Sequence, residues 1–197
     1  SANPLTPIWY RDPTADVAAN GSTPAYVAYK SGTTTVLVNS NVQVGDVLNG
    51  TAAQETIQSG PGNDTITGSA DDVLDLSQRF GSSGTVDVTA PVTVTLPNGS
   101  AEGSASSGNL LGTDTLVGIQ NVFTGKGADS VVGSDAANLI VTDLANDTVG
   151  SADTVDGGTG ADTIRTGAGA DVITYNPNAS IDAGSGVDTV RMSAAVI

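Results

Sequence analysis

The chain has 197 residues, a formal net charge of −15, and neither cysteine nor histidine. The absence of these two residue types excludes disulfides, zinc–thiolate sites, the Ser-His-Asp triad and HExxH metalloprotease sites. With only six Lys and Arg and no apolar run near the ~18 residues of a spanning helix, we expect no nucleic-acid partner and no membrane insertion.

Residues 1–24 contain four of the prolines and the only tryptophan, Trp9. Proline at this density disfavours helix and central strand, so we expect an extended N-terminal arm. Its apolar side chains, among them Leu5 and Ile8, are too many to be left in water. Two ways of covering them stay open, which are packing on the first coil of the same subunit and packing on a neighbouring subunit.

Residues 25–38 form two β-rich runs on either side of Ser31-Gly32, which predicts a hairpin. We expect residues 25–58 to be a β cap, because an open coil at the end of a repeat array exposes strand edges.

A repeat with a period of nine begins in residues 59–75. Residues 59–67 read S-G-P-G-N-D-T-I-T, with Asp64 in the turn and Ile66 in the core. Asp72 follows eight residues after Asp64, and Leu74 follows eight residues after Ile66. Residues 76–111 then interrupt the repeat with runs that alternate at period two, which predicts longer strands or an outward excursion.

Residues 112–197 carry the main block of repeats. Three frames cover 124–150 without a gap, which puts Asp129 and Asp147 eighteen residues apart. After a shift of frame, we expect Asp153, Asp171 and Asp188 to form one column of sites, whereas Asp162 lacks an acidic partner downstream. Asp114 and Asn138 stay uncertain as ligands.

The bias towards Gly and Asp indicates cation binding in the turns. All but two of the 21 acids are Asp. A turn that wraps a hard cation must aim carbonyls inward, which needs backbone angles that Gly reaches cheaply. The carboxylate must be short because the ligand oxygens lie at about 2.3–2.6 Å from calcium. Since the composition otherwise resembles that of a disordered chain, we expect folding to be coupled to calcium.

One stretch carries the full nonapeptide of calcium-binding β-rolls. Residues 157–165, G-G-T-G-A-D-T-I-R, fit G-G-x-G-x-D-x-U-x at every fixed position, and residues 166–174 differ only at the first Gly. The chain resembles the RTX (repeats-in-toxin) family. The resemblance implies an all-β fold, a right-handed parallel β-roll or β-solenoid with several calcium ions between turns that stack eighteen residues apart. The candidate ligands are Asp64, Asp72, Asp129, Asp147, Asp153, Asp162, Asp171 and Asp188, with the turn residues Gly157, Thr159, Gly167, Gly169, Gly184 and Gly186.

The resemblance also implies type I secretion and an extracellular or cell-surface location on a bacterium. Every acid that recurs with the period of the repeat already has a structural role, so we expect that the protein is not an enzyme. We expect a structural protein that polymerises through its N-terminal arm and solenoid ends into a surface layer, filament or biofilm matrix fibre. The alternatives are an RTX module of a calcium-dependent adhesin or of a secreted polysaccharide-acting enzyme, and calcium could bridge the protein to a cell-surface polysaccharide.

Overall fold

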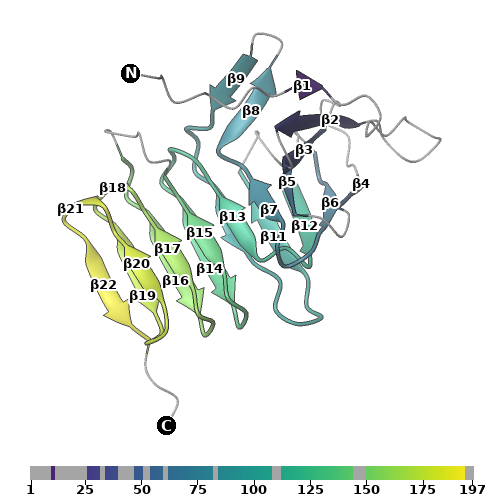
Figure 1. Cartoon of the computed structure of the whole chain (residues 1–197). Coiled ribbons are helices and arrows are strands. Elements are labelled where there is room, and N and C mark those ends of the chain that lie inside the picture. Colours follow the sequence, from purple (N-terminus) through teal and green to yellow (C-terminus); the bar gives the residue numbers. More distant parts are fainter. Residues whose placement is uncertain are drawn as a thin grey trace, which may run out of the picture.

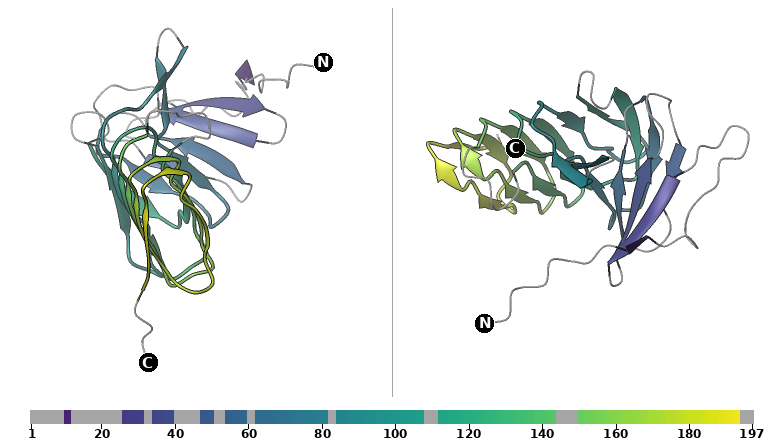
Figure 2. Two further views of the ribbon diagram at one scale, coloured as in Figure 1. Left: turned by 90° about the vertical axis from the view of Figure 1, so that its left-hand side faces the viewer. Right: turned by 90° about the horizontal axis from the view of Figure 1, so that it is seen from above.

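The computed structural model describes residues 10–11, 26–31, 34–39, 47–50, 54–59, 62–81, 84–107, 112–143 and 150–193. All regular elements of these ranges are β-strands, and most of the strands lie in two nine-stranded sheets. The two sheets run side by side along the molecule (Figure 1) and, seen end-on, form the long sides of a flattened coil (Figure 2). The described part of the chain has no helix of the length and hydropathy needed to cross a membrane.

The first sheet has the order β1-β2-β3-β5-β7-β13-β15-β17-β20. Its strands are β1 (Tyr10–Arg11), β2 (Tyr26–Ser31), β3 (Thr34–Asn39), β5 (Glu55–Gln58), β7 (Val73–Asp75), β13 (Asn121–Phe123), β15 (Leu139–Val141), β17 (Thr163–Arg165) and β20 (Ser180–Asp182). The second sheet has the order β22-β19-β16-β14-β10-β11-β12-β6-β4. Its strands are β22 (Thr189–Met192), β19 (Val172–Tyr175), β16 (Thr154–Gly158), β14 (Ser130–Ser134), β10 (Thr93–Thr95), β11 (Gly103–Ser106), β12 (Thr113–Val117), β6 (Thr65–Thr67) and β4 (Val47–Asn49).

The chain passes from one sheet to the other with almost every strand from β13 to β22, and in this part each strand pairs in parallel with its counterpart in the next coil. This is the winding of a β-roll, so the predicted all-β parallel architecture is confirmed. Two further strands, β18 (Ala168–Gly169) and β21 (Ser185–Gly186), pair at the turns of the last two coils.

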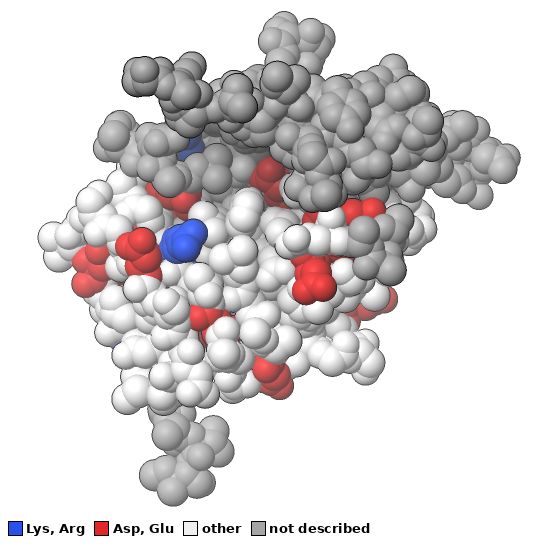
Figure 3. Space-filling view, in the orientation of Figure 1, with Lys and Arg blue, Asp and Glu red and all other residues white. Residues whose placement is uncertain are grey.

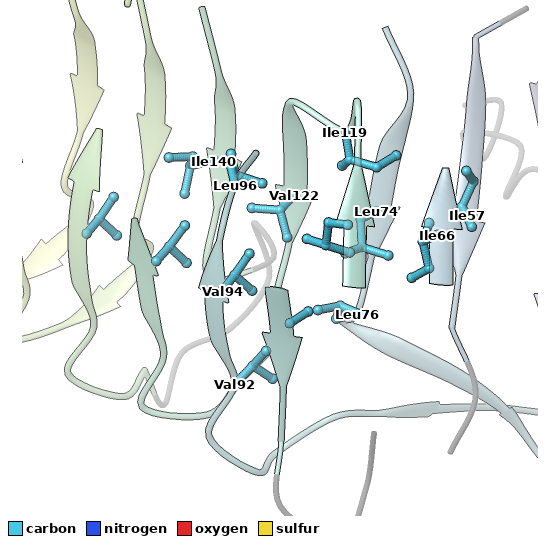
Figure 4. Close-up of a cluster of buried hydrophobic side chains, with 14 of the residues drawn as sticks. Ile57, Ile66, Leu74, Leu76, Val92, Val94, Leu96, Ile119, Val122 and Ile140 are labelled. Atoms are coloured by element: carbon cyan, nitrogen blue, oxygen red, sulfur yellow. The ribbon is translucent and has the colours of Figure 1, made fainter. Parts of the chain in front are cut away.

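The core consists of apolar side chains stacked in register between the sheets (Figure 4). In the strands of the two sheets from β4 to β19, the central inward position holds Val, Ile or Leu, or Ala105 in β11, and each of these side chains is at most 1% exposed. The register aligns Ile57, Leu74, Val122, Ile140, Ile164 and Ile181 in the first sheet, and Val94, Val131, Val155, Ile173 and Val190 in the second. Because successive strand residues alternate between faces, one apolar residue per short strand is enough to fill this narrow interior.

The N-terminal end of the first sheet is covered by an antiparallel hairpin. Strands β2 and β3 pair with Ser31 opposite Thr34, and β3 then runs parallel to β5. The predicted hairpin is therefore confirmed. Within the predicted arm, β1 pairs with β2 of the same chain, whereas residues 1–9 and 12–24 lie outside the described residues.

The segment that interrupts the repeat contributes both to the roll and to an excursion from it. Strands β8 (Gln78–Gly81) and β9 (Gly84–Asp87) pair only with each other and form a hairpin that projects from the roll (Figure 1). Strands β10 and β11 instead enter the second sheet between β14 and β12, with β11 antiparallel to both neighbours. In the first sheet β7 lies directly beside β13, so the second sheet gains strands that the first does not have.

Candidate metal sites

The turns of the roll gather along two edges, which differ in their polar side chains. The turns that precede strands of the second sheet comprise residues 124–129, 150–153, 166–171 and 183–188, and we name them the aspartate edge. The turns that precede strands of the first sheet comprise residues 134–138, 159–162 and 176–179, and we name them the amide edge.

Four aspartates form a continuous ladder along the aspartate edge. Each carboxylate accepts a hydrogen bond from the backbone N–H of the residue above it in the preceding coil. The Oδ1 atoms of Asp153, Asp171 and Asp188 accept from the N–H groups of Asp129 (2.8 Å), Asp153 (2.9 Å) and Asp171 (3.1 Å), respectively. The column of Asp153, Asp171 and Asp188 is therefore present, and it extends upward to Asp129.

The predicted stacking of Asp129 on Asp147 is wrong, because the partner of Asp129 is Asp153, 24 residues away. The reason is the length of the intervening turn. Residues 142–153 separate β15 from β16, whereas the shorter segment 166–171 separates β17 from β19. The gapless frames over 124–150 therefore do not follow the coil. Asp147 lies outside the described residues.

Threonine hydroxyls satisfy some of the second carboxylate oxygens on this edge. Thr124 and Thr142, both fully buried, donate to the Oδ2 atoms of Asp129 and Asp153. The corresponding hydroxyl of Thr166 instead donates to the carbonyl of Ala183 at 3.3 Å. The Oδ2 atom of Asp171 is buried and has no hydrogen-bond partner. A buried carboxylate oxygen without a donor is costly, so this atom is suited to contact a cation.

Glycine permits the close stacking of the last two turns of this edge. Gly184 (φ 72°) and Gly186 (φ 140°) have positive φ, and a Cβ at either would lie only 1.6 or 1.5 Å from the carbonyl oxygen of Gly167 or Gly169. The carbonyls of the predicted ligands Gly167 and Gly169 are thus directed at the next turn, and that of Gly167 accepts a hydrogen bond from the N–H of Ser185 at 2.8 Å. No group of three or more His, Cys, Asp and Glu gathers among the described residues, so a cation here would need backbone carbonyls beside the carboxylates. An all-oxygen set of carbonyls and carboxylates fits calcium.

Burial makes the charged form of these aspartates unfavourable without a cation. Desolvation raises the pKa of Asp129 to about 7 and that of Asp153 to about 6, against the hydrogen bonds from Thr124 and Thr142, which lower the two pKa values. The next carboxylate of the ladder adds a smaller repulsion in each case. A divalent cation between the turns would reverse this balance and favour the carboxylates.

A second carboxylate pair lies in the N-terminal half of the roll. The Oδ1 atom of Asp114 accepts from the N–H of Asp64 at 2.9 Å, and both residues are at most 1% exposed. A Cβ at Gly112 would lie 2.1 Å from the carbonyl oxygen of Gly62, so these turns also stack closely. Desolvation raises the pKa of Asp114 to about 7. Sequence spacing left Asp114 uncertain because it lies 50 residues from its partner. The Asp-Thr-Leu at 114–116, which repeats the Asp-Thr-Ile at 64–66, could have identified it.

Asp72 lies at the start of a first-sheet strand and is fully buried. Its Oδ1 accepts from the N–H of Glu55 at 2.8 Å and its Oδ2 from the N–H of Ser69 at 2.6 Å. The backbone thus supplies a donor to both of its oxygens.

Asp162 and Thr159 lie in the turn 159–162 of the amide edge, and Gly157 lies just before it in β16. The Oδ1 atom of Asp162 accepts from the N–H of Asn138 at 3.0 Å. Ala179 holds the corresponding position in the following coil, because it directly precedes Ser180, the partner of Thr163. Asp162 therefore has no acidic neighbour in register, as the sequence predicts. Its pKa is raised, chiefly by burial.

The family model described as RTX calcium-binding nonapeptide repeat (4 copies) matches residues 46–75, 111–149 and 150–177. These ranges contain Asp64, Asp114 and the ladder from Asp129 to Asp171. The comparison with curated proteins found no match. Repeats of this kind bind calcium ions at several sites, and the proteins that contain them are typically secreted by bacteria. The orphaned oxygen of Asp171 and the stacked glycine turns agree with such sites, and the chain is an RTX repeat protein, built as a calcium-binding β-roll.

Proposed function

We propose that the chain is a secreted structural protein that folds on calcium and assembles with copies of itself into a cell-surface layer, filament or matrix fibre. The observation that carries this proposal is the outer edge of the last described coil of the roll. Within the described residues, β20 and β22 have no neighbouring strand on their outer sides. Exposed strand edges favour pairing with another chain.

The same end exposes a core position that the earlier coils bury. Val190 continues the core column of Val155 and Ile173 but is 46% exposed, and Met192, in register with half-buried Tyr175, is 62% exposed. A strand of a second copy, placed beside β22 of the first, would cover Val190 as β22 covers Ile173. The opposite end of the first sheet is already covered by β1–β3, so the two ends offer unlike surfaces and can join head to tail.

Charge supports a role for calcium in this assembly. The formal net charge is −15, and the charged side chains on the face in Figure 3 are mostly acidic. Copies of such a chain repel one another without counterions. Bound calcium lowers this charge and also orders the coils whose edges would pair, so polymers should require the ion.

Electron microscopy of the purified chain, with calcium and with chelator, tests the proposal. We expect ordered polymers in calcium and none in chelator. Deletion of residues 1–24 tests the arm as the joint, and should abolish polymers while leaving the calcium-induced β signal. The change Val190→Lys tests the open end, with Thr154→Lys on the outer face of β16 as the control. Monodisperse monomers in calcium at high concentration would contradict assembly and favour the adhesin or enzyme module.

A further inference from the structure

The two edges of the roll treat their carbonyl oxygens differently. On the amide edge, the side-chain nitrogen of Asn176 lies 3.3 Å from the carbonyl oxygen of Gly158 and closer still to that of Gly160. These two carbonyls belong to the preceding coil, and both point at one place between the turns. The Asn176 amide occupies that place and is buried, with 6% of its surface exposed.

The orientation of the Asn176 amide is fixed by its other end. Its Oδ1 accepts a hydrogen bond from the N–H of Asn178 at 2.7 Å. If the amide were rotated to exchange its oxygen and nitrogen, the oxygen would face two carbonyl oxygens and the nitrogen would face an N–H. The hydrogen-bond pattern therefore places the NH₂ group between Gly158 and Gly160.

A related arrangement occurs two coils earlier. Asn138 accepts from the N–H of Ser134 at 2.7 Å through Oδ1, and its Nδ2 reaches the preceding coil, where it donates to the carbonyl and the side-chain oxygen of Gln120, both at 2.9 Å. In both turns the amide oxygen satisfies its own turn and the amide nitrogen holds the turn above.

We propose that the Asn176 amide takes the place of calcium on the amide edge between the turns 159–162 and 176–179, so that between these two coils calcium is held along the aspartate edge alone. The inference rests on calcium binding by the repeats and is independent of assembly. An NH₂ group offers two donors to two carbonyls, and it needs no carboxylate to balance a charge. It can therefore join successive coils where the chain lacks stacked aspartates.

The carboxylates of the two edges agree with this assignment. On the aspartate edge, Asp153 and Asp171 each have an Asp in register on both sides. Asp162 instead lies between Asn138 and Ala179, so a cation there would meet a single carboxylate. The Oδ2 of Asp162 is buried without a hydrogen-bond partner, as that of Asp171 is, and it lies near Gly157 of its own coil, 2.9 Å from where a Cβ at Gly157 would stand. The nonapeptide at 157–165 matches the motif at every fixed position, and yet the side of its turn that faces 176–179 is closed by an amide.

Asn176→Asp is the change that tests most directly whether the Asn176 amide takes the place of a calcium ion. The variant keeps an acceptor for the N–H of Asn178 and places its second carboxylate oxygen beside the carbonyls of Gly158 and Gly160. We expect it to bind one calcium ion more than the wild type, counted by native mass spectrometry and isothermal titration calorimetry. The control Asn176→Ala should bind the wild-type number of ions and melt at a lower temperature in calcium and in chelator alike.

The change Asp171→Asn tests the assignment of the ion to the aspartate edge. We expect Asp171→Asn to lose at least one ion. A loss of an ion in Asn176→Ala would overturn the inference, as would an unchanged count in Asn176→Asp.

A crystal structure of the wild type grown in calcium answers the same question without relying on a variant that folds. Anomalous difference density should appear between the turns 166–171 and 183–188 and be absent between 159–162 and 176–179. Density at the second place would show that Asn176 does not replace the ion there. Absence of density at both places would contradict calcium binding by the aspartate edge, which is a different failure.

Discussion

The backbone N–H of Asp153 donates a 2.9 Å hydrogen bond to Oδ1 of Asp171, eighteen residues later, and the Oδ2 of the same Asp171 has no hydrogen-bond partner. One oxygen of this carboxylate therefore joins two coils, and the other is buried without a hydrogen-bond donor. A cation is the missing partner that would satisfy the second oxygen and the ladder of negative charges together.

Asp171→Asn should raise the calcium concentration needed for folding. The variant keeps the acceptor for the N–H of Asp153 but loses the charge that a cation contacts. We expect the midpoint to rise at least tenfold, which corresponds to about 1.4 kcal/mol. A calcium titration followed by circular dichroism measures it. The matched control is Asp182→Asn, because exposed Asp182 caps only Gly184 of its own turn, and its midpoint should not move.

Thr142→Val should destabilise whatever fold persists at low calcium. The hydroxyl of Thr142 donates to the buried carboxylate of Asp153, and removal of a donor to a buried polar group costs about 1–3 kcal/mol. Thr166→Val removes a hydroxyl that donates to the carbonyl of Ala183 and should cost less. Urea unfolding at several calcium concentrations compares them. Equal losses in the two variants would show that the carboxylate does not depend on its threonine.

Low pH should favour folding when calcium is absent. Burial raises the pKa of Asp129 to about 7 and that of Asp153 to about 6, from an ordinary value of 3.8. Because the folded pKa exceeds the unfolded one, the stabilisation by protonation is complete below about pH 4 and is lost as the pH rises through 6 to 7. In chelator, the β signal and the melting temperature should be higher at pH 5 than at pH 8.

With calcium present the dependence on pH should reverse, because protons then compete with the ion for the same carboxylates. Melting curves in excess calcium over the same range provide the comparison. A melting temperature in chelator that rises from pH 5 to pH 8 would contradict the burial of these groups.

Core substitutions should depend strongly on position along the column. Ile164→Ala removes a fully buried side chain between neighbours in register on both sides, and such changes cost roughly 2–5 kcal/mol. Val190→Ala lies in the last coil, where the side chain is 46% exposed, and should cost well under half as much in the monomer. Chemical denaturation in saturating calcium measures both. In polymers the cost at Val190 should increase if a second copy covers it.

The sequence predicted the strands and one aspartate column because both depend on local period. Asp153, Asp171 and Asp188 stack as their spacing indicates, and Ile140, Ile164 and Ile181 keep the inward position through coils of unequal length. The N-terminal hairpin followed from two β-rich runs around Ser31-Gly32. Such patterns survive because each short strand must present one apolar residue to the interior.

The sequence could not predict which coils stack where the turns differ in length. Asp129 pairs with Asp153 because the segment 142–153 between β15 and β16 is longer than the others. Asp64 pairs with Asp114 because β12 lies beside β6 in the second sheet, with β10 and β11 on its other side. The role of Asn176 also follows only from the structure, since its partners Gly158 and Gly160 lie in the preceding coil.

The measurement that tests the central claim most directly is a calcium titration of the metal-free chain at pH 7.5, followed by far-ultraviolet circular dichroism with parallel ion counting. If calcium supplies the missing partner of the aspartate ladder, the metal-free chain should show a largely disordered spectrum. It should then gain its β signal cooperatively as several ions bind, and magnesium at the same concentration should not replace calcium. A full β spectrum in chelator that does not change when calcium is added would contradict the account.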